Sequence, residues 1–221
     1  MPLDVRDWGV RPYPGALVEM RALRAARARG DIPDTLLLVE HPPVVTVGVQ
    51  GDDGESLPEG VPVVRVERGG KSTYHGPGQL VGYPIVDLTP RGRDVRRFVR
   101  DVEEVVVRTL AEFGLTAGRV DGRRGVWVDG ARKIASIGVA VESWVTFHGF
   151  ALNASTDLAA FRAFHPCGMP GEWMTSVTRE LGRRVDPDEV RPPVIRAWEA
   201  VFGSPASPSA PPVPARASVA P

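Results

Sequence analysis

The most informative stretch of this 221-residue chain runs from residue 68 to residue 88 and reads RGGKSTYHGPGQLVGYPIVDL. Its first part, Arg68–Gly78, holds four glycines and a proline, a composition that predicts a loop. Its second part, Leu80–Leu88, is apolar with strand character and predicts a strand. Glycines let backbone N–H groups come close to a ligand, so this loop is a candidate binding site.

The tripeptide Gly70-Lys71-Ser72 imitates the end of a nucleotide-binding P-loop. That motif needs a glycine five residues before its second glycine, and this chain has Arg65 there. The motif also needs a helix that begins at the lysine, which the run His75-Gly76-Pro77-Gly78 prevents. A tight turn between two strands is the structural alternative. It explains the glycines, but it leaves the crowding of polar side chains unexplained.

Outside this stretch, strand-like segments alternate with helix-like ones. Helices are predicted at residues 16–29, 95–113 and 157–164, and from the helix-start signature at 186–189 to Phe202, with an interruption at Pro192-Pro193. Strands are predicted at residues 35–40, 44–47, 61–66, 80–88, 126–128, 134–141 and 145–152, with a hairpin turn at Asp129-Gly130. Strands interleaved with two main helices, without regular βαβ repeats, favour an α+β fold with a central mixed β-sheet flanked by helices.

The composition is that of an ordinary globular protein, with 43% apolar and 24% charged residues. The 27 acidic residues balance the 27 basic ones, which argues against nucleic acid as a partner of the whole surface. We find no secretory signal and no apolar run of membrane-spanning length, so we expect a cytoplasmic protein. Its single cysteine cannot form an intrachain disulfide.

The length suits one domain, which we place at residues 1–203. Residues 204–221 contain only Ala, Pro, Ser and Val apart from Arg216. Such a segment cannot bury a core, so we predict a disordered tail. Nothing in the sequence indicates more than a monomer.

Two residues are candidates for catalysis, Lys133 and Cys167. Only two of the 27 basic residues are lysines, and lysine can exchange a proton where arginine cannot. Codon bias toward arginine is the alternative explanation. Cys167 lies between Pro166 and Gly168, in a loop, although free cysteine is commonly a small buried apolar residue. A nearby ammonium favours the reactive thiolate, so we interpret the pair as a nucleophile and the group that activates it.

The four histidines, at positions 41, 75, 148 and 165, all lie at junctions between elements. None has the spacing of a metal-binding pair on one element, so no metal is predicted. We interpret His41 and His165 as structural. His75 and His148 lie beside glycines, where a ligand can come close, and we expect them to line the pocket.

Several segments resemble one enzyme family, the lipoyl(octanoyl) transferases or octanoyltransferases. They are residues 68–88, ARKIASIGVAV (131–141), TFHGFALN (146–153), HPCG (165–168) followed by TSV (175–177), and EHPPVVTVG (40–48). The resemblance implies a fold like that of lipoate and biotin protein ligases. Two local departures, Phe164-His165 before the PCG motif and Val45 in place of a frequent aromatic residue, bear on the shape of the acyl pocket.

The resemblance also implies an acyltransferase activity. An octanoyl group moves from octanoyl-acyl carrier protein to a lysine on lipoyl domains of 2-oxoacid dehydrogenase complexes and on the glycine cleavage H protein. In the family, the residue matching Cys167 carries the acyl group as a thioester, and the residue matching Lys133 lowers the pKa of that thiol. The acyl-contacting residues would be Arg68, Gly69, Gly70, Lys71, Ser72, Thr73, Tyr74, His75, Ser136, Ile137, Gly138, Gly149, Phe150 and Ala151, with His148 as an assisting residue.

The energetics of this reaction need no ATP or other cofactor, because thioester exchange is nearly isoenergetic and amide formation runs downhill. Burial of an octanoyl chain contributes about 0.8 kcal/mol per methylene. Ile137, Val139, Phe150 and Leu152 are suitable walls, or plain core residues. Three alternatives stay open: an ATP-dependent lipoate or biotin ligase, a non-catalytic acyl-binding protein, and a thioesterase. An arginine rim at positions 68, 123, 124 or 132 is a hypothetical steering surface for an acidic carrier.

Overall fold

The computed structural model describes residues 4–51, 60–162 and 173–203. A seven-stranded mixed sheet forms its centre, in the order β1-β2-β6-β10-β9-β8-β7. Only the β1–β2 pair in this sheet is parallel among the described strand pairs. The strands span Asp4–Val10 (β1), Thr35–Glu40 (β2), Gln79–Ile85 (β6), Ala117–Val120 (β7), Arg123–Val128 (β8), Arg132–Glu142 (β9) and Val145–Asn153 (β10).

A second, three-stranded sheet stands beside the first, in the order β4-β3-β5. Its strands are Val44–Val47 (β3), Val63–Arg65 (β4) and Ser72–His75 (β5). The strand β3 pairs in parallel with β4 and antiparallel with β5. The strand β5 of this small sheet belongs to the glycine-rich segment, which also contacts β9 of the main sheet through the hydrogen bond from Gly69 N–H to Val139 O.

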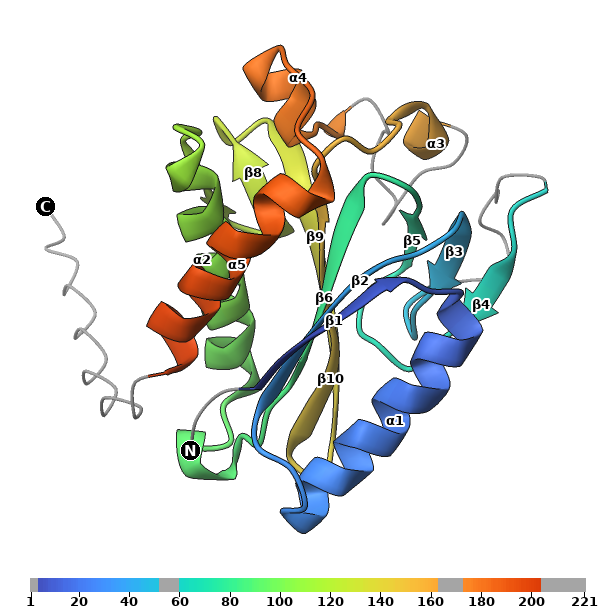
Figure 1. Ribbon diagram of the computed structural model, residues 1–221, viewed down its shortest axis with the longest axis vertical. Coiled ribbons are helices and arrows are strands. Elements are labelled where there is room, and N and C mark those ends of the chain that lie inside the picture. The colour runs from blue at the N-terminus through green and yellow to red at the C-terminus, as the bar shows by residue number, and fades with distance from the viewer. Residues whose placement is uncertain (1–3, 52–59, 163–172, 204–221) are drawn as a thin grey trace, which may run out of the picture.

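Three long helices cover the two faces of the main sheet: α1 (Tyr13–Arg29) on one face, and α2 (Val95–Glu112) with α5 (Pro187–Phe202) on the other (Figure 1). The short helices are α3 (Ala159–Arg162) and α4 (Val177–Leu181), with a 3₁₀ turn at Thr89–Arg91. No helix in the described ranges is both long enough and apolar enough to cross a membrane.

The helix α2 forms because its apolar residues recur every three or four positions. Phe98, Val102, Val106 and Leu110 are buried in the core shared with α5 and the sheet. Asp94 caps the start of the helix, where its side chain accepts a hydrogen bond from Arg97 N–H at 2.9 Å.

The hairpin predicted at Asp129-Gly130 is confirmed. Both residues have left-handed φ angles, 49° and 67°, as a tight turn between twisted strands requires. The turn joins β8 to β9, and it therefore fixes the register in which Lys133 lies opposite Trp127.

The predicted fold class, an α+β fold with a mixed sheet between helices, is confirmed. The strands predicted at 35–40 and 44–47 match β2 and β3 residue for residue. The sequence prediction missed β1, β7 and α4, which are short or carry charged residues on an exposed edge. The boundary predicted at residue 203 coincides with the end of the described residues, so the single domain and its tail stay predictions.

Two predictions about individual segments were wrong. The segment 68–78 is not a loop throughout, because Ser72–His75 forms β5 and pairs with β3. The glycines on both sides of this strand gave the whole segment the composition of a loop, so the strand was not predicted. The helix α5 is not interrupted at Pro192-Pro193. Pro193 is buried with the rest of the apolar face of α5, and this burial compensates for the helix hydrogen bonds that the prolines remove.

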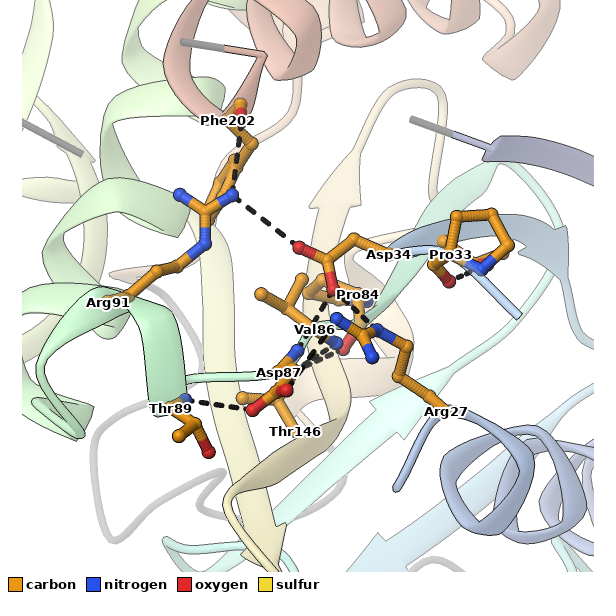
Figure 2. A network of polar contacts seen from close by, with 11 residues as sticks. Arg27, Pro33, Asp34, Pro84, Val86, Asp87, Thr89, Arg91, Thr146 and Phe202 are labelled. Carbon is orange, nitrogen blue, oxygen red and sulfur yellow. Dashed lines mark hydrogen bonds and ion pairs between the residues drawn. The ribbon is translucent and has the colours of Figure 1, made fainter. Parts of the chain in front are cut away.

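An acidic residue, Asp34, joins several elements at one end of the sheet (Figure 2). Its carboxylate accepts hydrogen bonds from Arg27 Nε at 2.8 Å and from the backbone N–H of Asp87 at 3.0 Å. Arg91 Nη2 lies 3.5 Å from the same carboxylate and donates to the carbonyl oxygen of Phe202 at 3.1 Å. The network thus ties the end of α1 to the sheet and to the end of α5.

Candidate active site

A cavity of about 430 Å³ opens where the glycine-rich segment meets the main sheet. This volume lies within the range of about 300–1,000 Å³ that is usual for small-molecule sites. The lining residues come from α1, the 68–75 segment, β6, the β7–β8 turn, β8, β9 and β10, together with Gln50 and Trp173.

Two glycines let neighbouring segments pack closely at the wall of the cavity. Gly138 on β9 and Gly149 on β10 lie directly opposite each other in the strand register, and both line the cavity. A Cβ atom on Gly149 would lie 2.2 Å from the carbonyl oxygen of Gly82, and one on Gly138 would lie 3.0 Å from Gly69 O. Any larger residue at position 149 would therefore push strands apart.

Arg68 holds the glycine-rich segment in shape. Its Nη1 atom donates to the carbonyl oxygens of Gly69 and Lys71, at 3.1 and 2.8 Å. Its Nη2 atom donates to the carbonyl and the hydroxyl of Thr46, both at 2.8 Å. A buried guanidinium with these acceptors is satisfied within the protein, so its main effect is to fix the backbone around Lys71.

A chain of buried hydrogen bonds begins at Thr46 and runs through His75. The Thr46 hydroxyl accepts from Arg68, so it donates to His75 Nε2 at 3.3 Å. His75 Nδ1 donates to Gln79 Oε1 at 2.8 Å, because an amide oxygen can only accept. The amide nitrogen of Gln79 in turn donates to Asn153 Oδ1 at 2.9 Å. These bonds explain the polar side chains that crowd the segment, and they need His75 in its neutral form.

The same chain of hydrogen bonds ends at the strand that carries Lys133. Asn153 Nδ2 donates to the carbonyl oxygen of Thr175 at 3.0 Å, and the Thr175 N–H donates to Lys133 O at 2.9 Å. Met174 forms an isolated parallel bridge with Lys133. The backbone that follows residue 172 is therefore fixed directly against β9.

Lys133 lies on the wall of the cavity and is only 2% exposed. Its Nζ atom is 5.7 Å from the centre of the Trp127 ring, a cation–π distance. A lysine buried in the wall of a cavity holds its amine close to whatever the cavity binds, so Lys133 is a candidate functional residue.

An ion pair next to Lys133 reinforces the same junction. Both carboxylate oxygens of Glu180 accept from Arg132, at 2.8 and 2.9 Å, and Glu180 Oε1 also accepts from the Thr175 hydroxyl at 2.5 Å. The hydrogen bonds from Arg132 lower the pKa of Glu180 below its ordinary value. Glu180 on α4 thus links the start of β9 to Thr175.

A cluster of buried histidine and tyrosine side chains adjoins the cavity. His41 Nδ1 donates to the carbonyl oxygen of Arg11 at 2.7 Å, so its Nε2 accepts from the Tyr83 hydroxyl at 2.7 Å. The Tyr13 hydroxyl oxygen lies 3.4 Å from His148 Nδ1. Burial lowers the pKa of His41 to about 4, that of His75 to about 3 and that of His148 to about 4. All three rings are therefore uncharged at neutral pH.

His148 has an unusual backbone conformation for a residue inside a strand. Its φ angle is 56°, in the left-handed region that costs a side chain energy. Its N–H donates to Met20 Sδ at 3.0 Å, and its Nε2 lies 3.8 Å from a carboxylate oxygen of Glu67. Strain of this kind is common where a side chain is aimed into a binding site.

The structure gathers most of the sequence-predicted site residues around this one cavity. The lining includes Arg68, Gly69, Gly70, Lys71, Thr73, His75, Lys133, Ser136, Ile137, Gly138, His148, Gly149, Phe150 and Ala151.

Two predicted substrate contacts, Ser72 and Tyr74, are not among the lining residues. They alternate with Thr73 and His75 along β5, and alternate side chains of a strand point to opposite faces. The Tyr74 ring packs edge-on against Phe161, with ring centroids 5.6 Å apart. Cys167 and His165 lie outside the described residues, so their predicted roles stay predictions.

The sequence analysis missed three aromatic contributors, Tyr13, Tyr83 and Trp173. Tyr13 stands at the start of α1 and Tyr83 inside a strand, where no motif marks them. Of the suggested apolar walls, Val139 and Leu152 pack with the core and are absent from the lining. No group of three or more His, Cys, Asp or Glu side chains in the described ranges is arranged to hold a metal.

Comparisons with known proteins identify the family of this chain. The family model of the lipoyl protein ligase A/B catalytic domain matches residues 13–199. An octanoyltransferase of Geobacter metallireducens is 50% identical over 187 residues, which cover 85% of this chain and 87% of that protein. An octanoyltransferase of Acidothermus cellulolyticus is 51% identical over 191 residues, with 85% and 86% covered.

A crystal structure of lipoate-protein ligase A bound with ATP has the same fold, with a TM-score of 0.72 and 21% identity over 92% of this chain and 86% of that one. The match to the family model and the curated relatives together extend over nearly all of the described residues. This chain belongs to the lipoyl protein ligase A/B catalytic-domain family.

Proposed function

We propose that this protein is an octanoyltransferase that moves an octanoyl group from octanoyl-acyl carrier protein to a lysine of lipoyl domains, through a thioester on Cys167. The acceptors would include the lipoyl domains of 2-oxoacid dehydrogenase complexes and the glycine cleavage H protein. The observation that supports this most directly is Lys133, which is buried in the wall of the cavity. Curated octanoyltransferases are 50% and 51% identical to this chain over the 85% of its length that aligns with them, which supports the same reaction.

The first step would load the enzyme. The Cys167 thiolate attacks the carbonyl carbon of the donor thioester, the new carbon–sulfur bond forms, and the bond to the donor sulfur breaks. The donor leaves as a thiolate and takes up the proton that Cys167 lost. Lys133 would take this proton from the thiol and return it to the donor sulfur, and its ammonium form would favour the attacking thiolate in between.

The second step would acylate the acceptor. The neutral amine of the acceptor lysine attacks the enzyme thioester, an amide bond forms, and the Cys167 sulfur leaves and is reprotonated. Conversion of a thioester into an amide runs downhill, so no ATP enters. Because burial holds the pKa of His148 near 4, this ring is a weak base at neutral pH. Its proposed role is to line the acyl site.

Intact-mass analysis tests the proposal. The full-length chain is mixed with octanoyl-acyl carrier protein without ATP, and an apo lipoyl domain is added afterwards. The wild type should gain the mass of one octanoyl group and then lose it to the lipoyl domain. Cys167→Ser should gain none, and Lys133→Arg should load at least roughly 100-fold more slowly because arginine cannot exchange a proton.

Two results would refute the proposal. The first is lipoyl-domain octanoylation by Cys167→Ser at the wild-type rate. The second is modification from free octanoate that requires ATP, which would make the protein a ligase like its structural relative. A monomeric state and a cytoplasmic location stay predictions, and sedimentation of the purified chain tests the first of them.

A further inference from the structure

The lining of the cavity carries a strong excess of positive charge. It contains five cationic residues, Arg68, Lys71, Arg123, Arg124 and Lys133, and no aspartate or glutamate among the described residues that line it. The whole chain has a formal charge of zero. Charge of one sign inside a cleft with low-dielectric walls attracts ligands of the opposite sign.

The cations at the cavity differ from arginines elsewhere in the fold. Across the rest of the described surface, arginines are commonly paired with carboxylates, as in the pairs Arg132–Glu180 and Arg196–Glu112. By contrast, within the described ranges no carboxylate lies within 4 Å of Lys71, Arg123 or Arg124. An anion supplied from outside would balance these three groups.

These three side chains come from two segments that line the cavity, the strand β8 and the glycine-rich segment. The Arg123 guanidinium stacks on the rings of Trp173 and Trp127, 4.9 and 5.3 Å from their centroids. A stacked guanidinium keeps the N–H groups at its edge free to bind an anion. The Arg124 guanidinium approaches Gly69, since a Cβ atom on that glycine would lie 3.6 Å from Arg124 Nη1.

Lys71 belongs to the glycine-rich segment. Its backbone is held by the hydrogen bond from Arg68 Nη1 to its carbonyl oxygen and by the Gly48 N–H, which donates to the same oxygen at 3.2 Å. The Lys71 side chain is half-buried, and those of Arg123 and Arg124 are exposed. The three cations can therefore be reached from solvent, unlike Arg68 and Lys133, which are buried.

We infer that Lys71, Arg123 and Arg124 form a collar that binds a phosphate ester on the acyl donor. An octanoyl thioester has no charge of its own, so the acyl chain cannot balance the charge of the collar. The anion must belong to the arm that carries the donor thiol. This inference rests on the proposed function and names the feature of the donor that the entrance recognises, a phosphorylated pantetheine-type arm.

The experiment compares two small donors that differ in one group. Octanoyl-pantetheine lacks a phosphate, and octanoyl-4′-phosphopantetheine has one. The rate of octanoyl loading on the full-length chain is measured by intact mass across a range of donor concentrations at low salt. The wild type should load at least roughly tenfold more efficiently from the phosphorylated donor, as expected for charge-assisted hydrogen bonds to a phosphate.

The variants Lys71→Gln and Arg124→Gln should bring this preference ratio close to one. Because both donors are measured on the same variant, effects on the fold or on the thiol cancel in the ratio. Arg196→Gln, which removes an exposed arginine on α5, is the matched control and should keep the wild-type ratio. High salt should weaken the preference in the wild type and leave the variants unaffected.

Octanoyl-coenzyme A and octanoyl-acyl carrier protein identify the source of the phosphate. An advantage for either that disappears in the collar variants supports the inference. A wild type without preference between the two small donors overturns it, and so does a preference that survives in both variants. If no donor loads the wild type, the proposed function itself fails, so the two failures are distinguishable.

Discussion

Replacement of Asp34 tests how far one carboxylate stabilises the fold. The Asp34 side chain is 15% exposed, and its partners Arg27 and Arg91 are 15% and 20% exposed. The change Asp34→Ala removes two well-formed hydrogen bonds, from Arg27 Nε and from the Asp87 N–H, and leaves two largely buried guanidinium groups without this acceptor (Figure 2).

The expected loss follows from these contacts. A hydrogen bond to a charged group contributes about 1.5–3 kcal/mol, and removal of one partner from a fully buried pair costs about 3–5 kcal/mol. Because some solvent reaches Asp34 and Arg91, we expect a loss of about 2–4 kcal/mol in the free energy of unfolding. Urea unfolding, followed by tryptophan fluorescence, measures it.

A matched control lies three residues away. Asp31 pairs with Arg29, but the two side chains are 53% and 63% exposed. Asp31→Ala should therefore leave the unfolding midpoint unchanged within error. Equal midpoints for the two variants would refute the conclusion that the Asp34 network contributes to stability.

Three further predictions concern the site. Glu180→Gln should slow octanoyl loading by roughly tenfold, because it loosens the junction beside Lys133. Glu112→Gln, which removes one partner of the exposed Arg196–Glu112 pair, should leave the loading rate unchanged. Equal loading rates for the two variants would contradict this prediction. Gly149→Ala should lower the free energy of unfolding by about 1–3 kcal/mol, because the added methyl group would meet Gly82 O. Gly15→Ala in α1, where the methyl group meets no atom within 4 Å, should not lower it, and thermal melting measures both. Because burial lowers the pKa of His41, His75 and His148, the free energy of unfolding should be highest above pH 6.5 and should fall as the pH is lowered toward 4. A urea unfolding midpoint that stays constant from pH 7 to pH 5 would contradict this.

Strong local patterns made much of the fold predictable. The periodic apolar residues of α2 and the continuous apolar run of β2 each gave the correct element, since both patterns reflect burial directly. The strand β5 escaped prediction because its stability comes from pairing with β3, a distant segment, while its own neighbours are glycines.

The site was predictable to a similar extent. The glycine-rich segment and Lys133 could be found from composition and from the scarcity of lysine. The hydrogen-bond partners of His75 could not be predicted from the sequence, because the hydrogen bonds through Gln79 and Asn153 depend on how β6 pairs with β10. Tyr13 joins the site through the placement of a whole helix, for which a single tyrosine gives no local signal.

The place of β10 in the sheet has a consequence for the order in which a newly made chain can fold. This strand lies between β6 and β9, yet it is the last of the sheet to be synthesised, after roughly two-thirds of the chain. Until Asn153 leaves the ribosome, the parts on either side exist as two separate half-sheets with exposed apolar faces. Nascent chains that end before β10 should therefore aggregate or bind chaperones, and those that extend past α5 should resist protease.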